Sequence, residues 1–277
     1  MQSLSQTVGR NGVNFRWDVA LVQALLTHAQ RPVNLDRNQR HYMHGIHGSS
    51  DPATVAAIRL FQSDQATLAR GTPSKEQPSG TVSPGDETWS ALVAAVPVQF
   101  SDLRVLPGSV TVYIADSPAR LAAVIEDAGN WGLHPSFLGK VTELMKVIHR
   151  DYGIAISVCS EGGLRSFDEQ LRQLKKGTSY AGPGEGLHCY GLAVDLGFKG
   201  LQWLRGNGTV VAKEDWWMHQ LKAQKPNEPS RFWDLLRDEG EANDLYRGPQ
   251  FDRPHLQAYH DSIIMAERFA ALLTSRP

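Results

Sequence analysis

The chain has 277 residues, of which 41% are hydrophobic, so it is long enough to bury the cores of two modest domains. It carries 28 basic and 29 acidic side chains and a net charge of -1, so it lacks the basic field expected of a nucleic-acid-binding protein. We expect no nucleic acid among its partners.

The number of cysteines and the lack of long apolar runs indicate which disulfides the chain can form and where it is made. Cys159 and Cys189 are the two cysteines, so neither a disulfide framework nor an all-cysteine metal site can form, although one bridge between them stays open. No apolar run approaches the ~20 residues of a membrane span, and residues 1–14 lack the apolar segment of a signal peptide. We therefore expect a protein made in the cytoplasm, without a classical signal peptide and without a membrane span.

Three short amphipathic helices are predicted in the first third of the chain. Apolar residues at helical spacing follow Asp18, which we expect to cap the first helix. Asp51 and Pro52 provide a cap and a first helical residue for the second helix. The third helix covers residues 87–95. We expect residues 1–97 to form a small all-α three-helix bundle.

This bundle resembles the peptidoglycan-binding module that accompanies many bacterial wall hydrolases. The resemblance rests on apolar and capping positions: Asp18, Val19, Val22, Gln23, Leu25, Leu26, Thr54, Ala57, Ile58, Phe61, Gln62, Pro84, Gly85, Thr88, Trp89 and Leu92. Any small helical bundle needs most of these residues for its core and caps, so an unrelated bundle is the alternative. The resemblance implies that residues 1–97 bind bacterial peptidoglycan.

A second domain is predicted after a linker. Residues 98–116 show no sustained periodicity and are expected to be the linker. A helix begins at Ser117, a longer helix spans residues 135–151, and alternation in residues 154–158 predicts a strand. Helices followed by strands favour an α+β catalytic domain over residues 117–277.

A pattern of histidine and aspartate in the second domain suits a metal ion. His188 and Asp195 flank a turn that Gly191 permits, so the imidazole and the carboxylate can converge from a rigid strand. A catalytic zinc site needs about three protein ligands and one open position. His255 offers the third ligand, and Asp252 would lie beside the open position, where a carboxylate can accept a proton. The sequence therefore predicts a zinc site with a general base.

The same segment resembles the zinc peptidases that include phage L-alanyl-D-glutamate endolysins, D-alanyl-D-alanine carboxypeptidases and dipeptidases, and the zinc fold of hedgehog signalling domains. The matching residues follow the family's order: Glu161, Gly162, Arg165, Ser166, Gln170, Pro183, Gly184, Glu185, His188, Tyr190, Gly191, Leu192, Ala193, Val194, Asp195, Asp252, Pro254, His255 and Gln257. The resemblance implies a small antiparallel sheet with helices and implies that His188, Asp195 and His255 bind zinc. It also implies that Asp252 is the general base. Gly186 departs from the pattern, because the family usually has serine there, so a hydroxyl contact is missing here.

Four further matching residues are candidates for contact with the substrate. Arg165 is predicted to be catalytic, because it follows the predicted strand, as in the family, where a guanidinium can clamp an oxyanion or a substrate carboxylate; a surface cation is the less favoured alternative. Gln170 is either a substrate contact or part of a helix surface. Ser166 and Tyr190 complete the predicted substrate-binding residues.

The resemblance implies a zinc metallopeptidase that hydrolyses the stem peptides of peptidoglycan. Its closest likeness is to the phage endolysins, so the bond between L-Ala and D-Glu is the expected cleavage site. A D-Ala-D-Ala carboxypeptidase or D,D-endopeptidase is the alternative within the family, and a non-catalytic wall-binding protein with a structural zinc is the alternative outside it.

The expected setting is the periplasm or the cell wall. A wall enzyme without a signal peptide suits a phage lysin released through holins, or an antibacterial effector injected by a secretion machine. An effector would have an immunity protein as a partner.

Overall fold

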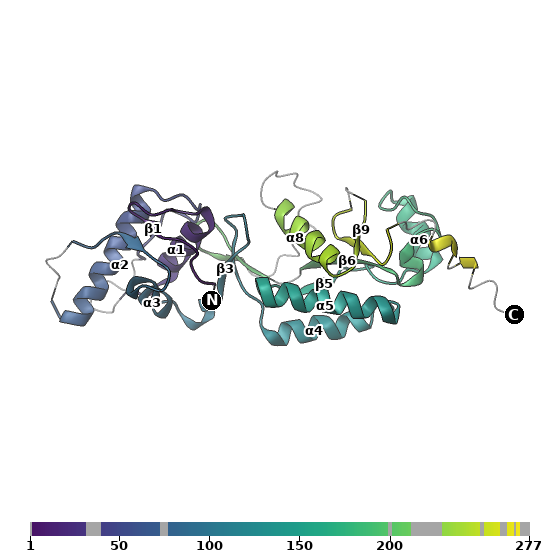
Figure 1. Ribbon diagram of the computed structural model, residues 1–277, viewed down its shortest axis with the longest axis horizontal. Helices are drawn as coiled ribbons and strands as arrows, with labels where there is room; N and C mark the ends of the chain where they lie inside the picture. The colour runs from purple at the N-terminus through teal and green to yellow at the C-terminus, as the bar shows by residue number, and fades with distance from the viewer. Residues whose placement is uncertain are drawn as a thin grey trace. The chain divides into compact units, whose positions relative to one another are not determined.

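The chain forms two compact units with helices and small antiparallel sheets, an architecture that agrees with the α+β class predicted for the second domain. The computed structural model describes residues 2–31, 40–72, 77–198, 201–211, 229–249, 252–260, 265–268 and 270–271. Unit 1 takes Met1–Ala115 and Gly200–Glu214, and unit 2 takes Asp116–Lys199 and Asp215–Pro277 (Figure 1).

Unit 1 contains helices and two small sheets. Its α-helices, which contact one another, are α1 (Arg16–His28), α2 (Pro52–Arg70) and α3 (Glu87–Ala94). The first sheet pairs β1 (Val8–Gly9) with β2 (Thr81–Val82). The second has the strand order β3 (Leu103–Val105), β4 (Val112–Ile114), β7 (Gln202–Leu204) and β8 (Val210–Val211). The three helices lie where the sequence predicts them, but the unit is not all-α.

The segment predicted as a linker, residues 98–116, is largely structured. It contains a 3-10 helix, η1 (Val98–Phe100), followed by β3 and β4, and β4 pairs with β7. Strands this short leave little local periodicity, and the partner strand lies far along the chain, so the pairing has no signal in a sequence window. Unit 1 therefore extends beyond the predicted boundary at residue 97 and takes β7 and β8 from the predicted second domain.

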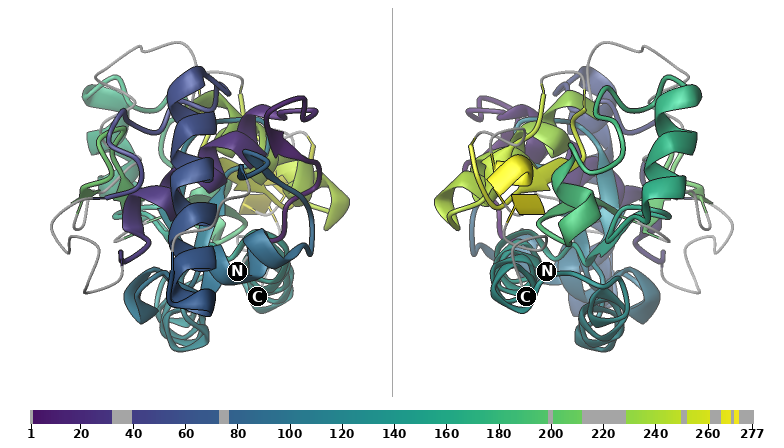
Figure 2. Two further views of the ribbon diagram at one scale, coloured as in Figure 1. Left: turned by 90° about the vertical axis from the view of Figure 1, so that its left-hand side faces the viewer. Right: turned by 90° about the vertical axis from the view of Figure 1, so that its right-hand side faces the viewer.

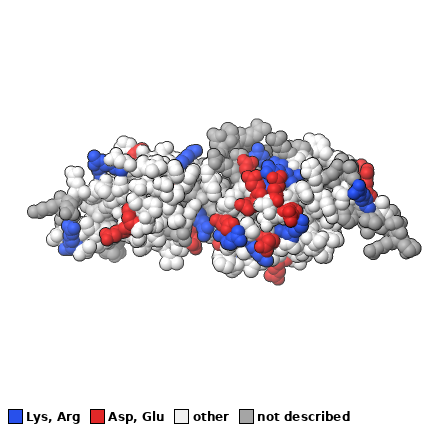
Figure 3. Space-filling model, viewed as in Figure 1, with Lys and Arg blue, Asp and Glu red and all other residues white. Residues whose placement is uncertain are grey.

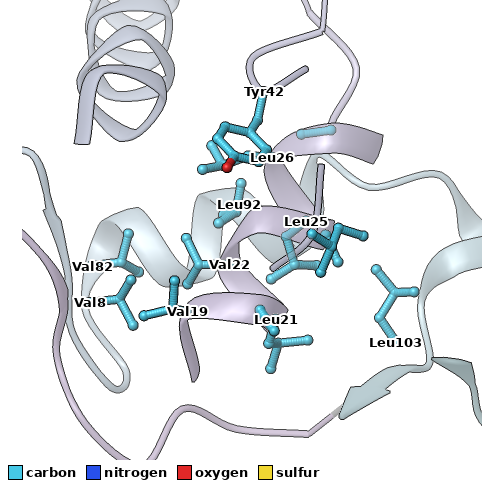
Figure 4. Close-up of a cluster of buried hydrophobic side chains, with 14 of the residues drawn as sticks. Val8, Val19, Leu21, Val22, Leu25, Leu26, Tyr42, Val82, Leu92 and Leu103 are labelled. Carbon is cyan, nitrogen blue, oxygen red and sulfur yellow. The ribbon is translucent and has the colours of Figure 1, made fainter. Parts of the chain in front are cut away.

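The core of unit 1 is built around α1. All residues of α1 from Asp18 to Thr27 are buried, so the helix is enclosed on every side rather than on one stripe. Figure 4 shows its apolar side chains among those of neighbouring elements, including Val8, Val82, Leu92 and Leu103. By contrast, α2, the long blue helix in the left view of Figure 2, buries a single face.

The cap predicted for α2 is confirmed, whereas the cap predicted for α1 is wrong. Asp51 accepts a hydrogen bond from the Thr54 N–H at 2.7 Å, and Pro52 occupies the first turn of α2 as predicted. The prediction that Asp18 caps α1 is wrong, because the helix begins at Arg16 and Asp18 is buried within it. The Asp18 carboxylate instead accepts three hydrogen bonds from the backbone and hydroxyl of Ser5 and the backbone of Gln6, a contact that no local pattern shows.

Unit 2 holds a four-stranded antiparallel sheet with helices packed against it. The strand order is β5 (Ile156–Val158), β6 (Ala193–Phe198), β10 (His255–Gln257) and β9 (Tyr246–Arg247). The helices of the described residues include α4 (Pro118–Gly129), α5 (Pro135–Tyr152), α6 (Phe167–Lys175) and α8 (Pro229–Ala242). α4 and α5 run side by side against β5, and α8 contacts α5 and β9 (Figure 1).

The surface of unit 2 mixes charges of both signs. In Figure 3 the acidic and basic side chains of this unit are interspersed, and Arg247 pairs with Asp238 and Glu241 between β9 and α8. Among the described residues, no helix combines the length and the apolar character that crossing a membrane requires.

Candidate metal centre

Three side chains that are far apart in sequence meet in unit 2. His188 lies in the 3-10 helix η2 (Leu187–Tyr190), Asp195 on β6 and His255 on β10. Asp195 Oδ1 lies 3.1 Å from His255 Nδ1 and 3.4 Å from His188 Nε2, and the two ring nitrogens are 3.2 Å apart. The structure therefore brings together all three predicted ligands in one group that could hold a metal ion.

Strand register sets the position of two of these residues. β6 and β10 are antiparallel, and Asp195 lies directly opposite His255. Side chains directly opposite on adjacent strands project from the same face of a sheet. On the other face, Val194 and Leu256 are opposite each other and fully buried, so the hydrophobic core holds this register.

The third residue depends on a turn that glycine allows. Gly191 ends η2 with a φ of 66°, and a Cβ there would lie 2.6 Å from the carbonyl oxygen of Gly132. Only glycine fits both restrictions. The turn leads the chain from His188 into β6, so the imidazole and the Asp195 carboxylate face each other.

Hydrogen bonds fix which nitrogen of each imidazole faces the group. His188 Nδ1 lies 2.9 Å from the carbonyl oxygen of Gly163, and His255 Nε2 lies 3.1 Å from Gln257 Oε1. The Gln257 amide nitrogen donates to the carbonyl oxygen of Tyr259 at 2.6 Å, which orients its oxygen toward His255. Carbonyl oxygens only accept, so these outer ring nitrogens carry the protons and the inner ones present lone pairs. Converging lone pairs with outer-shell acceptors are the arrangement of metal-binding histidines.

Arg165 orients the carboxylate of the group. Its Nη2 donates to Asp195 Oδ2, and its Nε donates to the carbonyl oxygen of Glu161 at 2.7 Å. With Oδ2 bound to the guanidinium, Oδ1 faces the two histidines. The structure thus shows that Arg165 contacts Asp195, a candidate metal ligand, which the sequence did not indicate. Contact of Arg165 with a substrate stays a prediction.

The three groups shift each other's pKa. Burial lowers the pKa of His188. Burial also acts to lower the pKa of His255, but the hydrogen bond and charge of Asp195 outweigh it and raise that pKa. Burial acts to raise the pKa of Asp195, yet the charge and hydrogen bond of His188, together with His255, hold it well below its usual range. Metal ions bind deprotonated ligands, so the affinity of this group for a metal ion should fall as the pH falls.

Asp252 lies beside the three residues, as predicted. Its Oδ2 is 3.8 Å from His255 Nδ1, and its side chain keeps 36% of its accessible surface. Burial and the nearby charge of Asp195 raise the pKa of this carboxyl. A partly exposed carboxyl with a raised pKa next to the group can both accept and return a proton.

The predicted substrate-binding residues are engaged in internal hydrogen bonds. Ser166 caps α6 in a reciprocal pair with Glu169, and the Tyr190 hydroxyl donates to the carbonyl oxygen of Gly184 at 2.9 Å. Gln170 is 1% exposed, which excludes a helix-surface position, and its amide nitrogen donates to Ser179 Oγ and the carbonyl oxygen of Ala181, both at 2.8 Å. These bonds shape the segment that leads to His188, and substrate contact by these side chains stays a prediction.

Gln257 contacts His255, a role that the sequence pattern did not predict. Residues two apart on a strand share a face, so its place two residues after His255 was the available signal. Cys159 is buried and Cys189 is half-buried, and neither belongs to the group of His188, Asp195 and His255.

We predict that Gln257→Leu weakens metal binding by about tenfold to hundredfold. Without the acceptor at Gln257, the His255 ring is no longer held in one orientation and one tautomer. Gln257→Glu keeps an acceptor and should retain more affinity. Titration calorimetry with Zn²⁺ measures the affinity. Gln202→Leu, at an exposed position of β7, is the matched control, and His188→Ala is the variant expected to lose zinc binding. Equal affinity of Gln257→Leu and the unmodified chain would show that Gln257 does not position His255.

We predict that Gly186→Ser stabilises the chain. Gln170 Oε1 is buried without a hydrogen-bond partner among the described residues, and a Cβ on Gly186 would lie 3.6 Å from the Gln170 amide nitrogen without a clash. A serine hydroxyl there can donate to Oε1, a bond worth about 1 kcal/mol. Gly186→Ala supplies the Cβ alone, so the Ser-minus-Ala difference in denaturant unfolding isolates the hydroxyl; a difference of zero would contradict the bond.

Comparison with models of known protein families and with curated proteins finds no match for this chain.

Proposed function

We propose that the chain is a zinc-dependent peptidase that hydrolyses the stem peptides of bacterial peptidoglycan. The observation that carries this proposal is the group of His188, Asp195 and His255 with the Asp252 carboxylate 3.8 Å from His255 Nδ1. The order of these residues in the sequence and their resemblance to zinc wall peptidases support it.

The donor set favours zinc. Two imidazoles and one carboxylate are typical of catalytic zinc sites, which keep a further position open. Neither cysteine is in the group, so a soft, thiolate-rich site is not built here. When bound, zinc supplies a Lewis acid that polarises a carbonyl and makes water more acidic.

The chain's own residues supply proton transfer and orientation. Asp252 takes the proton of the attacking water and returns it to the leaving amine, since it is near the group and open to solvent. Arg165 holds Asp195 by its second oxygen, and Gln257 holds His255 by its outer nitrogen. These two contacts keep the ligands in place during turnover.

The bond between L-Ala and D-Glu is the proposed cleavage site, because the segments around His188 and His255 look closest to phage endolysins. A D-Ala-D-Ala carboxypeptidase or D,D-endopeptidase activity is the alternative. Digestion of purified peptidoglycan with mass analysis of the fragments distinguishes these bonds by the new termini that appear.

A non-catalytic protein with a structural metal is the competing class. A structural site has no use for a partly exposed carboxyl beside its ligands, and Asp252 is such a group. This feature favours the enzyme.

Unit 1 is proposed to bind the wall. A groove of about 680 Å³ runs along the first turns of α2, and its lining includes Arg10, Asn11, Asn14 and Arg59. The Nε atom of Arg59 is buried without a hydrogen-bond partner among the described residues. Amide and guanidinium groups of this kind suit the carboxylates and acetamido groups of peptidoglycan.

The proposed setting is wall lysis from the periplasm or the cell wall, by a phage lysin or by an injected antibacterial effector. In the second case an immunity protein that covers the metal centre would be the partner.

We predict that Asp252→Asn slows peptidoglycan hydrolysis by about a hundredfold to ten-thousandfold, because asparagine keeps the shape but cannot take the proton. Zinc content and thermal stability should change little. Release of soluble fragments from sacculi measures the rate, with Asp168→Asn on the exposed side of α6 as the control. An unchanged rate would place the base elsewhere, and loss of zinc would make Asp252 a ligand.

We predict that Arg59→Gln reduces retention of the chain on sacculi by about tenfold, the effect of losing a charged hydrogen bond. Binding is measured by co-sedimentation of the full chain in the Asp252→Asn background, which leaves the sacculi undigested. Arg70→Gln, at the other end of α2, is the matched control. If both variants sediment like the parent chain, the groove is not the wall-binding surface.

A further inference from the structure

A buried arginine on α8 is bonded to the turn that carries Asp252. Arg237 is 7% exposed, and its Nη2 donates to the carbonyl oxygens of Gly248 at 2.9 Å and Pro249 at 3.3 Å. Burial lowers the pKa of this guanidinium, and the charges of Arg247 and Arg253 lower it further. Arg237 thus connects α8 to Gly248 and Pro249, the two residues that directly follow β9.

The same carbonyl groups belong to a chain of hydrogen bonds that ends at Asp252. Pro249 O also accepts the backbone N–H of Asp252 at 2.9 Å, and Asp252 O accepts the N–H of His255 at 3.3 Å. Gly248 N–H donates to His255 O at 3.1 Å. Arg237 therefore bonds to the carbonyl oxygen that anchors the Asp252 backbone.

Asp252 depends on this turn more than the metal-binding residues do. His255 begins β10, which pairs with β6 on one side and β9 on the other. Asp252 lies before the strand and has no place in either ladder. Loss of the Arg237 bonds should loosen Asp252 while the sheet keeps His255 opposite Asp195.

The fold itself has little need of a guanidinium at this position. Arg237 Nε is buried without a hydrogen-bond partner among the described residues, and an incompletely bonded buried charge is costly. Gly248 is half-buried and Pro249 is exposed, so water can replace the guanidinium at their carbonyl groups. A methionine of similar length would fill the space with less desolvation.

We propose that Arg237 is a positioning residue, which holds the turn of Gly248 and Pro249 so that the Asp252 carboxylate stays beside the metal centre. The effect on catalysis rests on the proposed function, whereas the effect on the turn does not. A purely structural role predicts a uniform loss of stability; a positioning role predicts a local loss of order and a selective loss of rate.

Hydrogen exchange of the metal-free full chain tests the positioning role without any activity. In Arg237→Met, exchange of the peptide containing Asp252 should accelerate at least severalfold, while the peptide containing Leu256 and Gln257 keeps its protection. Arg237→Lys, which retains a donor, should restore part of the protection. Arg247→Met is the matched control, because it removes a nearby charge that bonds to carboxylates on α8 rather than to the turn. Unchanged exchange at Asp252 in Arg237→Met would overturn the proposal.

Kinetics of the zinc-loaded chain then test the catalytic consequence. Arg237→Met should lower kcat at least tenfold, with zinc affinity and KM close to those of the unmodified chain, and Arg237→Lys should recover part of the rate. A fall in zinc affinity as large as the fall in kcat would overturn the selective effect on Asp252. If exchange accelerates at the turn but the unmodified chain cleaves no peptidoglycan, the positioning role stands and the proposed function fails.

Discussion

The antiparallel register of β6 and β10 is the constraint on which the candidate site depends. It places Asp195 opposite His255 on one face and Val194 opposite Leu256 on the other. A slip of one residue would turn the buried pair toward the metal centre and the ligands toward the core, at a cost in buried apolar surface. The hydrophobic core of unit 2 therefore maintains the distance between the Asp195 carboxylate and the His255 imidazole, two of the three candidate metal ligands.

Around this pair, each polar group has a defined direction. His188 donates outward to Gly163 and His255 outward to Gln257, while one oxygen of Asp195 accepts from Arg165. The inner nitrogen atoms of the two imidazoles and Oδ1 of Asp195 then face one another. A buried arrangement of this kind is unfavourable without a cation, which is the physical reason it indicates a metal ion.

The two units also show which structural features the local sequence pattern predicts and which it does not. α2 begins at the predicted cap, because Asp51 and Pro52 act within one turn of the helix. β3, β4, β7 and β8 were missed, since each has only two or three residues and its partners lie in distant segments. Asp18 was misread as a cap because its hydrogen bonds go to Ser5 and Gln6, outside the helix that the pattern describes.

By itself the sequence determined the α+β class, the positions of α1 to α5 and three residues that could hold a metal ion, because helical periodicity, caps and ligand spacing act over a few residues. Only the tertiary structure decided what surrounds those residues. Arg165 bonds to Asp195, Gln257 orients His255, and Arg237 reaches the turn before Asp252. Such contacts depend on where strands and helices pack after the chain has folded, and long-range packing of this kind leaves no periodic trace in the order of residues.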